Sequence, residues 1–294
     1  MPLFQKPVPA LPSSLGLSGK TALVTGANRG LGYTTSQHFV RHGISKLVLA
    51  VRSRQAGETT RETLLQEAAG RKDGQTLEII VRELDMNSLA SVSAFVRGLE
   101  ADELQVHIAL LNAGINKMEW SVSEETGNES VFQVNYVSTA ALSLLLLPIL
   151  IRTSEASGSC SYLTVVGSEM QGMSSWNKKK VAPASVFGEF NNKSTFSGFT
   201  RYGDTKYLVF QFVHRLAQEV DPAKITVLVT CPGMVATEFG RADMPFWLVG
   251  PVKLVQALRA RTPKQGGLLI AYAATGLAGD AAHGELVTNM AVNP

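Results

Sequence analysis

The chain of 294 residues is poor in cysteine and in charged side chains. Cys160 and Cys231 are the only cysteines, and both lie in strand-like apolar stretches. This usage indicates small buried side chains in a reducing compartment rather than a disulfide framework. Charged residues make up 17% of the chain, the net charge is +3, and the only basic run, at 178–180, is interpreted as a solvated loop tip. The composition therefore excludes a disordered chain and gives no reason to expect a nucleic-acid partner.

Long apolar runs are also missing. The longest, residues 140–151, is far shorter than the ~20 residues that a membrane-spanning helix requires. It predicts a buried helix. The first twelve residues contain four prolines and no uninterrupted apolar stretch, so residues 1–17 are expected to form an extended arm rather than a signal peptide. We therefore expect a soluble, cytoplasmic protein with no integral membrane segment.

Strand-like and helical stretches alternate along the rest of the chain. This alternation predicts right-handed βαβ units, and hence a single α/β domain over 18–294 with a doubly wound parallel sheet and helices on both faces. Apolar residues make up 45% of the chain, which is enough for a large core. About seven strands are predicted, at residues 20–25, 46–51, 77–82, 107–112, 160–166, 224–230 and 285–290.

A glycine-rich turn, Thr-Gly-Ala-Asn-Arg-Gly-Leu-Gly at 25–32, stands between the first strand and a helical stretch. In this context Gly26 would permit a sharp turn, and Gly30 would let the backbone approach a pyrophosphate. Gly32 would allow close packing of helix on strand, with the phosphates at the helix N-terminus. The alternative is a tight βα loop that binds no ligand.

Tyr202 and Lys206 are four residues apart, so on a helix they lie on the same face. At ~4 Å and an effective dielectric constant of ~20, the lysine charge would contribute roughly 4 kcal/mol, or about three pKa units. It would lower the pKa of the phenol and make Tyr202 a proton donor and acceptor near neutral pH. Taken alone, the spacing fits any amphipathic helix, and it is the glycine turn that favours the catalytic interpretation.

The turn spacing Gly-x-x-x-Gly-x-Gly, together with this pair, resembles the short-chain dehydrogenase/reductase family from about residue 18 to the end. Thr205 stands where many members have serine, which is a conservative difference. In length and layout the chain is similar to the retinol-dehydrogenase-like and fungal secondary-metabolism branches of the family. Further matches follow in the family's order: Asn112-Ala113-Gly114, Asn135 after a valine, Ser168 at the end of a strand, and Pro232-Gly233-x-Val235-x-Thr237.

The resemblance implies a Rossmann fold and four catalytic roles. Tyr202 would be the general acid in reduction and the general base in oxidation, and Ser168 would bind the substrate oxygen. Lys206 would lower the tyrosine pKa and bind the nicotinamide ribose, and Asn135 would hold a water that leads from Lys206 towards solvent. The alternatives are that Ser168 only caps the strand end and that the backbone satisfies Asn135.

The cofactor follows from charge. The second strand runs into Arg52 and Arg54 with no acidic residue before Glu58, and Arg29 lies inside the glycine turn. A carboxylate at this point would favour NAD, whereas guanidinium groups favour the 2′-phosphate of NADP(H). The alternative for each arginine is an ordinary surface charge. The resemblance adds further cofactor residues and implies that Asp85 and the Met86 backbone contact the adenine. Together with the charge pattern it predicts that the cofactor binds to Gly26, Asn28, Arg29, Gly30, Leu31, Gly32, Arg52, Asp85, Met86, Asn112, Ala113, Gly114, Tyr202, Lys206, Pro232, Gly233, Val235 and Thr237. No metal is predicted.

Two segments are predicted to bind the substrate. Residues 169–201 separate Ser168 from Tyr202 and are rich in methionine and aromatic residues, and an apolar stretch at 244–250 lies in a second segment, 238–262. As mobile lids they would cover a lipophilic, ring-containing substrate. Ordinary packing of loop aromatics is the alternative.

Three functions remain open at this point. The leading hypothesis is reduction of a carbonyl group, or oxidation of the matching alcohol, on a lipophilic metabolite. The same scaffold could instead catalyse an isomerisation or a cyclisation after or in place of reduction, or it could sense a nucleotide without turnover. A homodimer is an open alternative to a monomer.

Overall fold

The computed structural model describes residues 5–71, 74, 76–178, 183–239 and 246–293, and one eight-stranded sheet runs through them. The strand order is β3-β2-β1-β4-β5-β6-β7-β8, and all neighbours are parallel except β7 and β8. The predicted doubly wound α/β fold is confirmed. The strands are β1 (Thr21–Thr25), β2 (Lys46–Val51), β3 (Glu78–Glu83), β4 (Ile108–Leu111), β5 (Ser161–Val166), β6 (Ile225–Cys231), β7 (Leu286–Thr288) and β8 (Ala291–Asn293).

Helical segments connect these strands. They are α1 (Gly30–Arg41), α2 (Arg54–Ala68), α3 (Leu89–Ala101), α4 (Ser130–Phe132), the π-helix η1 (Gln133–Val137), α5 (Ser138–Ser157), the short 3-10 helices η2 (Glu169–Met173) and η3 (Ser175–Lys178), α6 (Pro183–Phe190), η4 (Lys193–Thr195), α7 (Arg201–Ala217), α8 (Phe246–Arg259), α9 (Pro263–Ala274) and η5 (Asp280–Ala282). Part of the predicted lysine run and residues 240–245 lie outside the described residues.

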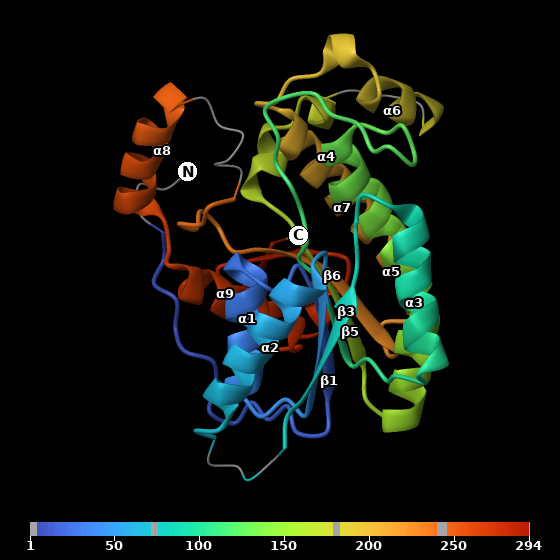
Figure 1. Ribbon diagram of the computed structural model, residues 1–294, viewed down its shortest axis with the longest axis vertical. Coiled ribbons are helices and arrows are strands. Elements are labelled where there is room, and N and C mark those ends of the chain that lie inside the picture. The colour runs from blue at the N-terminus through green and yellow to red at the C-terminus, as the bar shows by residue number, and fades with distance from the viewer. Residues whose placement is uncertain (1–4, 72–73, 75, 179–182, 240–245, 294) are drawn as a thin grey trace.

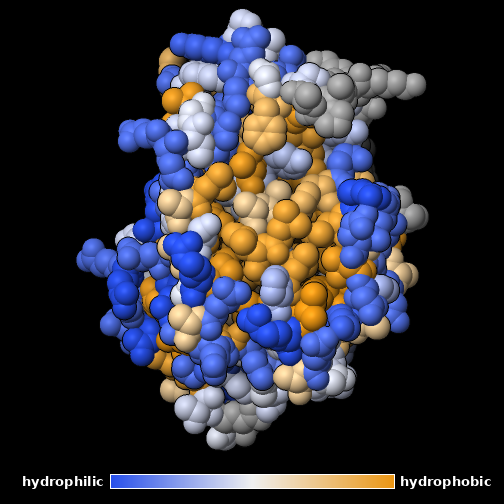
Figure 2. Space-filling model, turned by 90° about the vertical axis from the view of Figure 1, so that its right-hand side faces the viewer, coloured by the Kyte–Doolittle hydropathy of each residue, from blue (hydrophilic) through white to orange (hydrophobic). Residues whose placement is uncertain are grey.

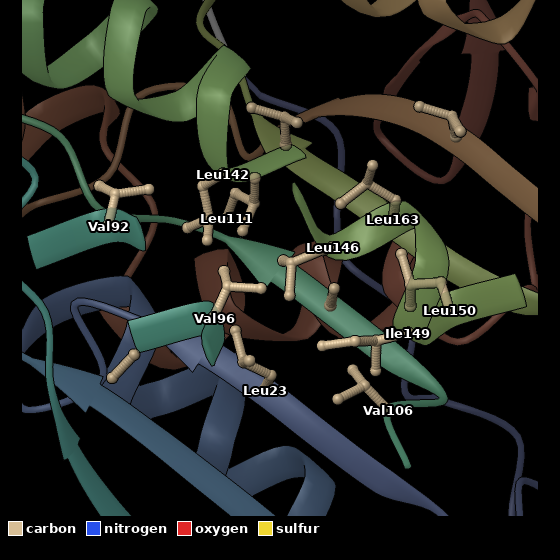
Figure 3. Close-up of a cluster of buried hydrophobic side chains, with 14 of the residues drawn as sticks. Leu23, Val92, Val96, Val106, Leu111, Leu142, Leu146, Ile149, Leu150 and Leu163 are labelled. Atoms are coloured by element: carbon tan, nitrogen blue, oxygen red, sulfur yellow. The ribbon is translucent and has the colours of Figure 1, made fainter. Parts of the chain in front are cut away.

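The sheet is covered on both faces, as the sequence predicts. Helices α1, α2 and α9 lie on one side, and α3, α5 and α7 lie on the other (Figure 1). The core on the second side is formed by leucine and valine side chains of β1, β4 and β5 that meet α3 and α5 (Figure 3). Each strand in the middle of the sheet is apolar on both faces because both faces are buried.

The last predicted strand is too long. It ends at Thr288 because Asn289 and Met290 have φ angles of 52° and 59°, which form a tight turn. The chain then returns antiparallel as β8, with Val287 opposite Val292. The sheet therefore has eight strands rather than about seven, and its last pair is a hairpin.

One helix among the described residues is long and apolar enough to cross a membrane. Segments α4, η1 and α5 run on as one 28-residue helix, Ser130–Ser157, with a mean hydropathy of 2.0 in its most apolar window. This helix is longer than the apolar run at 140–151 suggests. Half of that window is buried inside the domain, where it packs on the sheet. Such burial favours the predicted core helix over a membrane span.

The N-terminal arm is attached to the domain from residue 5 onwards. Leu11 and Leu17 are buried in the core on the α1 side of the sheet. No helix or strand forms between residues 5 and 20.

The described residues of the segment 169–201 form four short helical elements before α7 begins, and they pack as part of the domain. Trp176 and Phe190 are buried together with Phe132 and Leu208. The segment is also tied to α7, because the hydroxyl of Ser174 donates to Asp204 Oδ1 at 2.7 Å. Part of this segment is therefore core rather than a mobile lid.

Candidate active site

The four predicted catalytic residues come from three elements that meet at one end of the sheet. Tyr202 and Lys206 lie in the first turns of α7, Ser168 follows the end of β5, and Asn135 lies in the π-helix η1. The carboxyl ends of β1, β4, β5 and β6 lie side by side at this edge, because the four strands are parallel neighbours. Ligands of open α/β sheets bind outside this edge, where the strand order reverses.

Lys206 is held beneath Tyr202. Its Nζ donates to the carbonyl oxygen of Val166 at 2.7 Å and lies 5.6 Å from the centroid of the Tyr202 ring. The side chain of Ser168 lies close enough to that of Tyr202 to lower the pKa of the phenol. Ser168 Oγ also accepts the N–H of Met170 at 3.2 Å, so the predicted catalytic serine is at the same time a cap.

The expected direction of the tyrosine pKa shift is wrong for this structure. Burial raises the pKa of Tyr202, the neighbouring Cys231 raises it further, and the hydrogen bond from Ser168 lowers it. Burial also lowers the pKa of Lys206 to about 8, against a smaller opposing effect of Cys231. Lys206 is buried and Tyr202 is partly buried, and desolvation disfavours the ammonium and the phenolate alike. The expected lowering of the Tyr202 pKa considered only the charge of Lys206 and left out desolvation, which has the larger effect.

Asn135 is bound to the backbone on both sides of its amide. Its Oδ1 accepts the N–H of Ile115 at 2.8 Å, and its Nδ2 donates to the Ile115 carbonyl oxygen at 2.9 Å. The Nδ2 also lies 3.2 Å from the hydroxyl of Thr205 on α7. Backbone groups therefore satisfy the amide of Asn135, and the same amide also lies beside Thr205 in the candidate site. Single π turns inside α-helices are frequent at functional sites.

The glycine turn has the conformation that its sequence predicts. Gly26 and Gly30 have φ angles of 63° and 57°, which favour glycine. A Cβ on Gly32 would lie 2.4 Å from the Gly26 carbonyl oxygen, so only glycine fits there. The helix that follows, α1, has Arg29 as its N-cap residue and no side-chain cap. Its first N–H groups therefore remain available for an anion.

Asn112 fastens this turn to β4. Its backbone N–H donates to Thr25 Oγ1 at 2.9 Å, and its side-chain Nδ2 donates to the Thr25 carbonyl oxygen at 2.9 Å. The backbone of Gly114 passes close to Asn135, since a Cβ there would lie 3.2 Å from Asn135 Oδ1. Asn112 and Gly114 thus shape the floor of the site.

The residues predicted for the adenosine end lie after the carboxyl ends of β1, β2 and β3. Arg29 and Arg52 are exposed, and within the described part of the chain neither forms an ion pair. Glu58 forms ion pairs with Arg54 at 3.9 Å and Arg61 at 3.2 Å.

The predicted adenine residues follow β3. Asp85 accepts the N–H of Asn87 at 2.9 Å, and Met86 is buried. The remaining turn residues, Asn28 and Leu31, are half-buried, and so is Ala113 next to the turn.

The Pro-Gly segment, Pro232 to Thr237, is held by residues that sequence reasoning missed. Arg261 Nη1 donates to the Pro232 carbonyl oxygen at 3.1 Å and to Gln5 Oε1 at 2.6 Å. Gln5 in turn donates to the Met234 carbonyl oxygen at 2.8 Å. Val235 is buried and pairs with Arg261 in a short parallel bridge, and Gly233 has a φ angle of 74°. The N-terminal arm therefore reaches the candidate nicotinamide end.

The aromatics of the predicted substrate segments divide into two groups. Trp176 and Phe190 point into the core, and Phe187 and Phe199 are 48% and 62% exposed, so these four do not form one pocket wall. The expectation that the aromatic residues of 169–201, which are these four and Phe196, together cover the substrate is therefore wrong. The fifth, Phe196, packs edge-on against Trp120 at 5.4 Å between ring centroids.

Phe239, in the second predicted segment, contacts Tyr202, the candidate catalytic tyrosine. Its ring centroid lies 5.3 Å from that of Tyr202, and the side chain is 45% exposed. A cavity of about 330 Å³ adjoins this segment, lined by Met234, Pro251, Val252, Val255 and Gln256. Of the apolar stretch at 244–250, residues 244 and 245 and the side chains of 247 and 248 lie outside the described residues.

Known proteins resemble this chain over most of its length. Residues 20–175 match the family model described as short chain dehydrogenase. A short chain dehydrogenase of Arthrobotrys oligospora is 37% identical over 275 residues, which are 93% of this chain and 84% of that protein. The short chain dehydrogenase yanD of Aspergillus niger is 35% identical over 292 residues, which are 98% of this chain and 87% of that protein.

Solved structures share the fold. RhlG of Pseudomonas aeruginosa in an active-site complex with NADP superposes with a TM-score of 0.66 at 24% identity, over 93% of this chain and 96% of that chain. A short-chain dehydrogenase from Sphingobium yanoikuyae in complex with NADPH has a TM-score of 0.64 at 21% identity, over 92% of this chain and 87% of that chain. At these identities the likeness shows the architecture alone.

Proposed function

Since the chain belongs to the short-chain dehydrogenase/reductase family of oxidoreductases, we propose that it transfers a hydride between NADPH and a carbonyl or alcohol group of a lipophilic, ring-containing metabolite. The observation that carries this proposal is the cluster of Ser168, Tyr202 and Lys206 at the carboxyl edge of the sheet, with Ser168 close enough to lower the pKa of the phenol and Lys206 beneath its ring.

In reduction, Tyr202 donates its phenolic proton to the carbonyl oxygen of the substrate. Burial raises its pKa, so the phenol stays protonated through the neutral pH range and is ready to act as an acid. Ser168 donates a hydrogen bond to the same oxygen and stabilises the charge that develops there. When bound, NADPH supplies the hydride to the carbonyl carbon.

Lys206 and Asn135 support the proton transfer. The Lys206 ammonium, fixed by the Val166 carbonyl, stabilises the phenolate that remains after the proton has left. Asn135, fixed by Ile115, stands beside Thr205 on the turn that lies between Tyr202 and Lys206. It would hold the water through which Tyr202 and Lys206 are reprotonated.

The chain fits NADP(H). Gly26 and Gly30 adopt the left-handed backbone conformation of a phosphate-binding turn, and nothing lies within 4 Å of the place where a Cβ of Gly30 would be. The uncapped N-terminus of α1 would bind the pyrophosphate, and Arg29 and Arg52 would bind the 2′-phosphate. Asp85 and the Met86 backbone would contact the adenine, and the Pro232 to Thr237 segment would border the nicotinamide.

The substrate side supports a lipophilic molecule. The half-exposed ring of Phe239 offers an apolar contact beside Tyr202. The largely apolar cavity between Met234 and α8 offers further apolar contacts in the second predicted substrate segment. A metabolite of fungal secondary metabolism is the substrate class that we propose, because the matched relatives from Aspergillus niger and Arthrobotrys oligospora favour a fungal context.

We further propose that the protein is a cytoplasmic homodimer. Apolar surface gathers on the side that α3, α5 and α7 cover (Figure 2). On α5, Leu144 is 50% and Leu145 40% exposed, which favours burial of this helix against a second copy. Light scattering would give a dimer mass for the wild type and a monomer mass for a variant with Leu144→Glu and Leu145→Glu. A wild-type monomer would contradict the dimer.

The test of the function is NADPH oxidation in the presence of a panel of lipophilic ketones and aldehydes, each with product analysis. Carbonyl-dependent oxidation with formation of the alcohol supports the reductase. An isomerised or cyclised product without net oxidation of NADPH would support the alternative scaffold chemistry. Tight NADPH binding without conversion of any compound would support nucleotide sensing.

A further inference from the structure

Arg201 and Glu129 form an ion pair in the interior. Arg201 Nε lies 3.7 Å from Glu129 Oε2, and the two side chains are 6% and 0% exposed. Burial of two charges is costly, and their attraction repays that cost only with good geometry and further hydrogen bonds. A buried ion pair is therefore weak evidence that the pair stabilises the fold. The segments that Glu129 and Arg201 hold in place indicate the role of the pair better.

Glu129 holds the start of the helix that carries Asn135. Its two carboxylate oxygens accept the N–H groups of Val131 at 2.8 Å and Phe132 at 2.9 Å, which are the first free donors of α4. The helix continues from α4 into the π-helix that contains Asn135. The position of the Glu129 carboxylate therefore sets the start of this helix.

Arg201 holds the start of the helix that carries Tyr202. It is the first residue of α7 and directly precedes Tyr202. Its guanidinium carbon lies 4.5 Å from the ring centroid of Phe190 and 5.3 Å from that of Phe196. A planar guanidinium between aromatic rings has few alternative orientations. Arg201 is thus fixed by the 169–201 segment as well as by Glu129.

We propose that Glu129 and Arg201 are a positioning pair. The pair fixes the position of the helix that bears Asn135 relative to the helix that bears Tyr202. Neither residue touches the reacting atoms, and the pair acts through the two helix starts. It also gives the aromatic segment a function: Phe190 and Phe196 set the orientation of the arginine that precedes the catalytic tyrosine. The inference rests on the proposed function, because its effect on turnover presupposes reduction by Tyr202.

The test compares Glu129→Gln, Arg201→Met and the double variant with Leu64→Ala. Leu64 is fully buried on α2, on the other side of the sheet, so its truncation destabilises the fold without touching the pair. All assays are run well below the lowest unfolding midpoint. We expect each single variant to lower kcat by about 10–100-fold with little change in NADPH Kd. The kcat of the double variant should be no lower than that of the slower single variant. Leu64→Ala should keep the wild-type kcat.

A second readout does not depend on turnover. Hydrogen exchange of the backbone over 130–137 and 201–206 should accelerate together in either single variant, because loss of either partner breaks the ion pair that joins the two helix starts. Acceleration only in the segment that contains the substituted residue, or kcat within twofold of wild type in both single variants, would overturn the inference. If the wild type reduces no carbonyl while the two segments still respond together, the proposed reductase fails and the positioning pair stands.

Discussion

The side-chain amide of Asn135 donates to the hydroxyl of Thr205 at 3.2 Å, across the two helices that carry the candidate catalytic residues. Thr205 Oγ1 in turn donates to the Tyr202 carbonyl oxygen at 2.8 Å. The hydroxyl therefore bridges the asparagine and the tyrosine. This explains why threonine can replace the serine that the family resemblance led us to expect at this position, since both residues supply the hydroxyl.

Replacement of Thr205 by valine should lower kcat roughly five- to tenfold, because it removes a bridging hydrogen bond of about 1 kcal/mol while keeping the side-chain shape. Thr205→Ser is the matched control and should stay within twofold of wild type. Steady-state kinetics with a reducible carbonyl gives the comparison. Equal losses in the serine and valine variants would mean that packing of the methyl group, and not the hydroxyl, matters at Thr205.

Arg52→Asp should weaken NADPH binding far more than NADH binding. The change replaces a charge-assisted contact with the 2′-phosphate, worth roughly 1.5–3 kcal/mol, by repulsion. Arg54→Asp is the matched control, because Arg54 is also exposed but lies against Glu58 at 3.9 Å. Fluorescence titration with both cofactors provides the dissociation constants. A proportional loss for NADPH and NADH would assign Arg52 to the fold or to the adenine pocket.

The pH dependence of stability should reveal Lys206. Its pKa is lowered from 10.5 to about 8 in the folded protein. Below pH 8 the ammonium is charged in both states and its burial destabilises the fold. Between pH 8 and 10.5 the unfolded chain binds more protons than the folded one, so folding stability rises with pH.

The stability of the wild type relative to Lys206→Met should therefore increase between pH 7 and pH 10, by on the order of 2–3 kcal/mol. Urea denaturation at the two pH values measures this difference, and the methionine variant has no titrating group at the position. A difference independent of pH would mean that the hydrogen bond to the Val166 carbonyl keeps the pKa of Lys206 near its ordinary value.

Phe190→Ala should destabilise the fold by about 3–5 kcal/mol, because Phe190 is fully buried among Phe132, Trp176 and Leu208. Phe199→Ala, in the same segment but 62% exposed, should change stability by less than about 0.5 kcal/mol. Thermal and chemical unfolding of both variants gives the contrast. A similarly small effect of both substitutions would restore the mobile lid that the sequence suggested.

The sequence predicts those elements whose conformation is set by residues adjacent in the chain. The strands β1 to β6 agree with the predicted ranges within one residue at each end, because runs of apolar residues bounded by turn signals fix them locally. The glycine turn was predicted for the same reason, since Gly26 and Gly30 need φ angles that few other residues adopt.

The features that were missed depend on packing between distant segments. Gln5 and Arg261 are 256 positions apart, and no sequence pattern links them. The burial of Phe190 rather than Phe199, and the desolvation that raises the pKa of Tyr202, are likewise set by neighbours from other elements. A pair spacing on one helix predicts which side chains share a face, but it does not predict how much water surrounds them.

The most direct test of the account is deuterium transfer to a lipophilic carbonyl compound from NADPH that carries deuterium at both C4 positions of the nicotinamide, in the wild type and in Tyr202→Phe. The account predicts that the wild type forms an alcohol carrying one deuterium per NADPH consumed. Tyr202→Phe should bind NADPH nearly as well and turn over ~10²–10⁴-fold more slowly, because only the phenolic proton donor is removed. Wild-type protein that binds NADPH tightly and transfers no deuterium to any compound would contradict the central claim. So would Tyr202→Phe with more than about a tenth of wild-type kcat when chemistry is rate-limiting, because another group must then donate the proton.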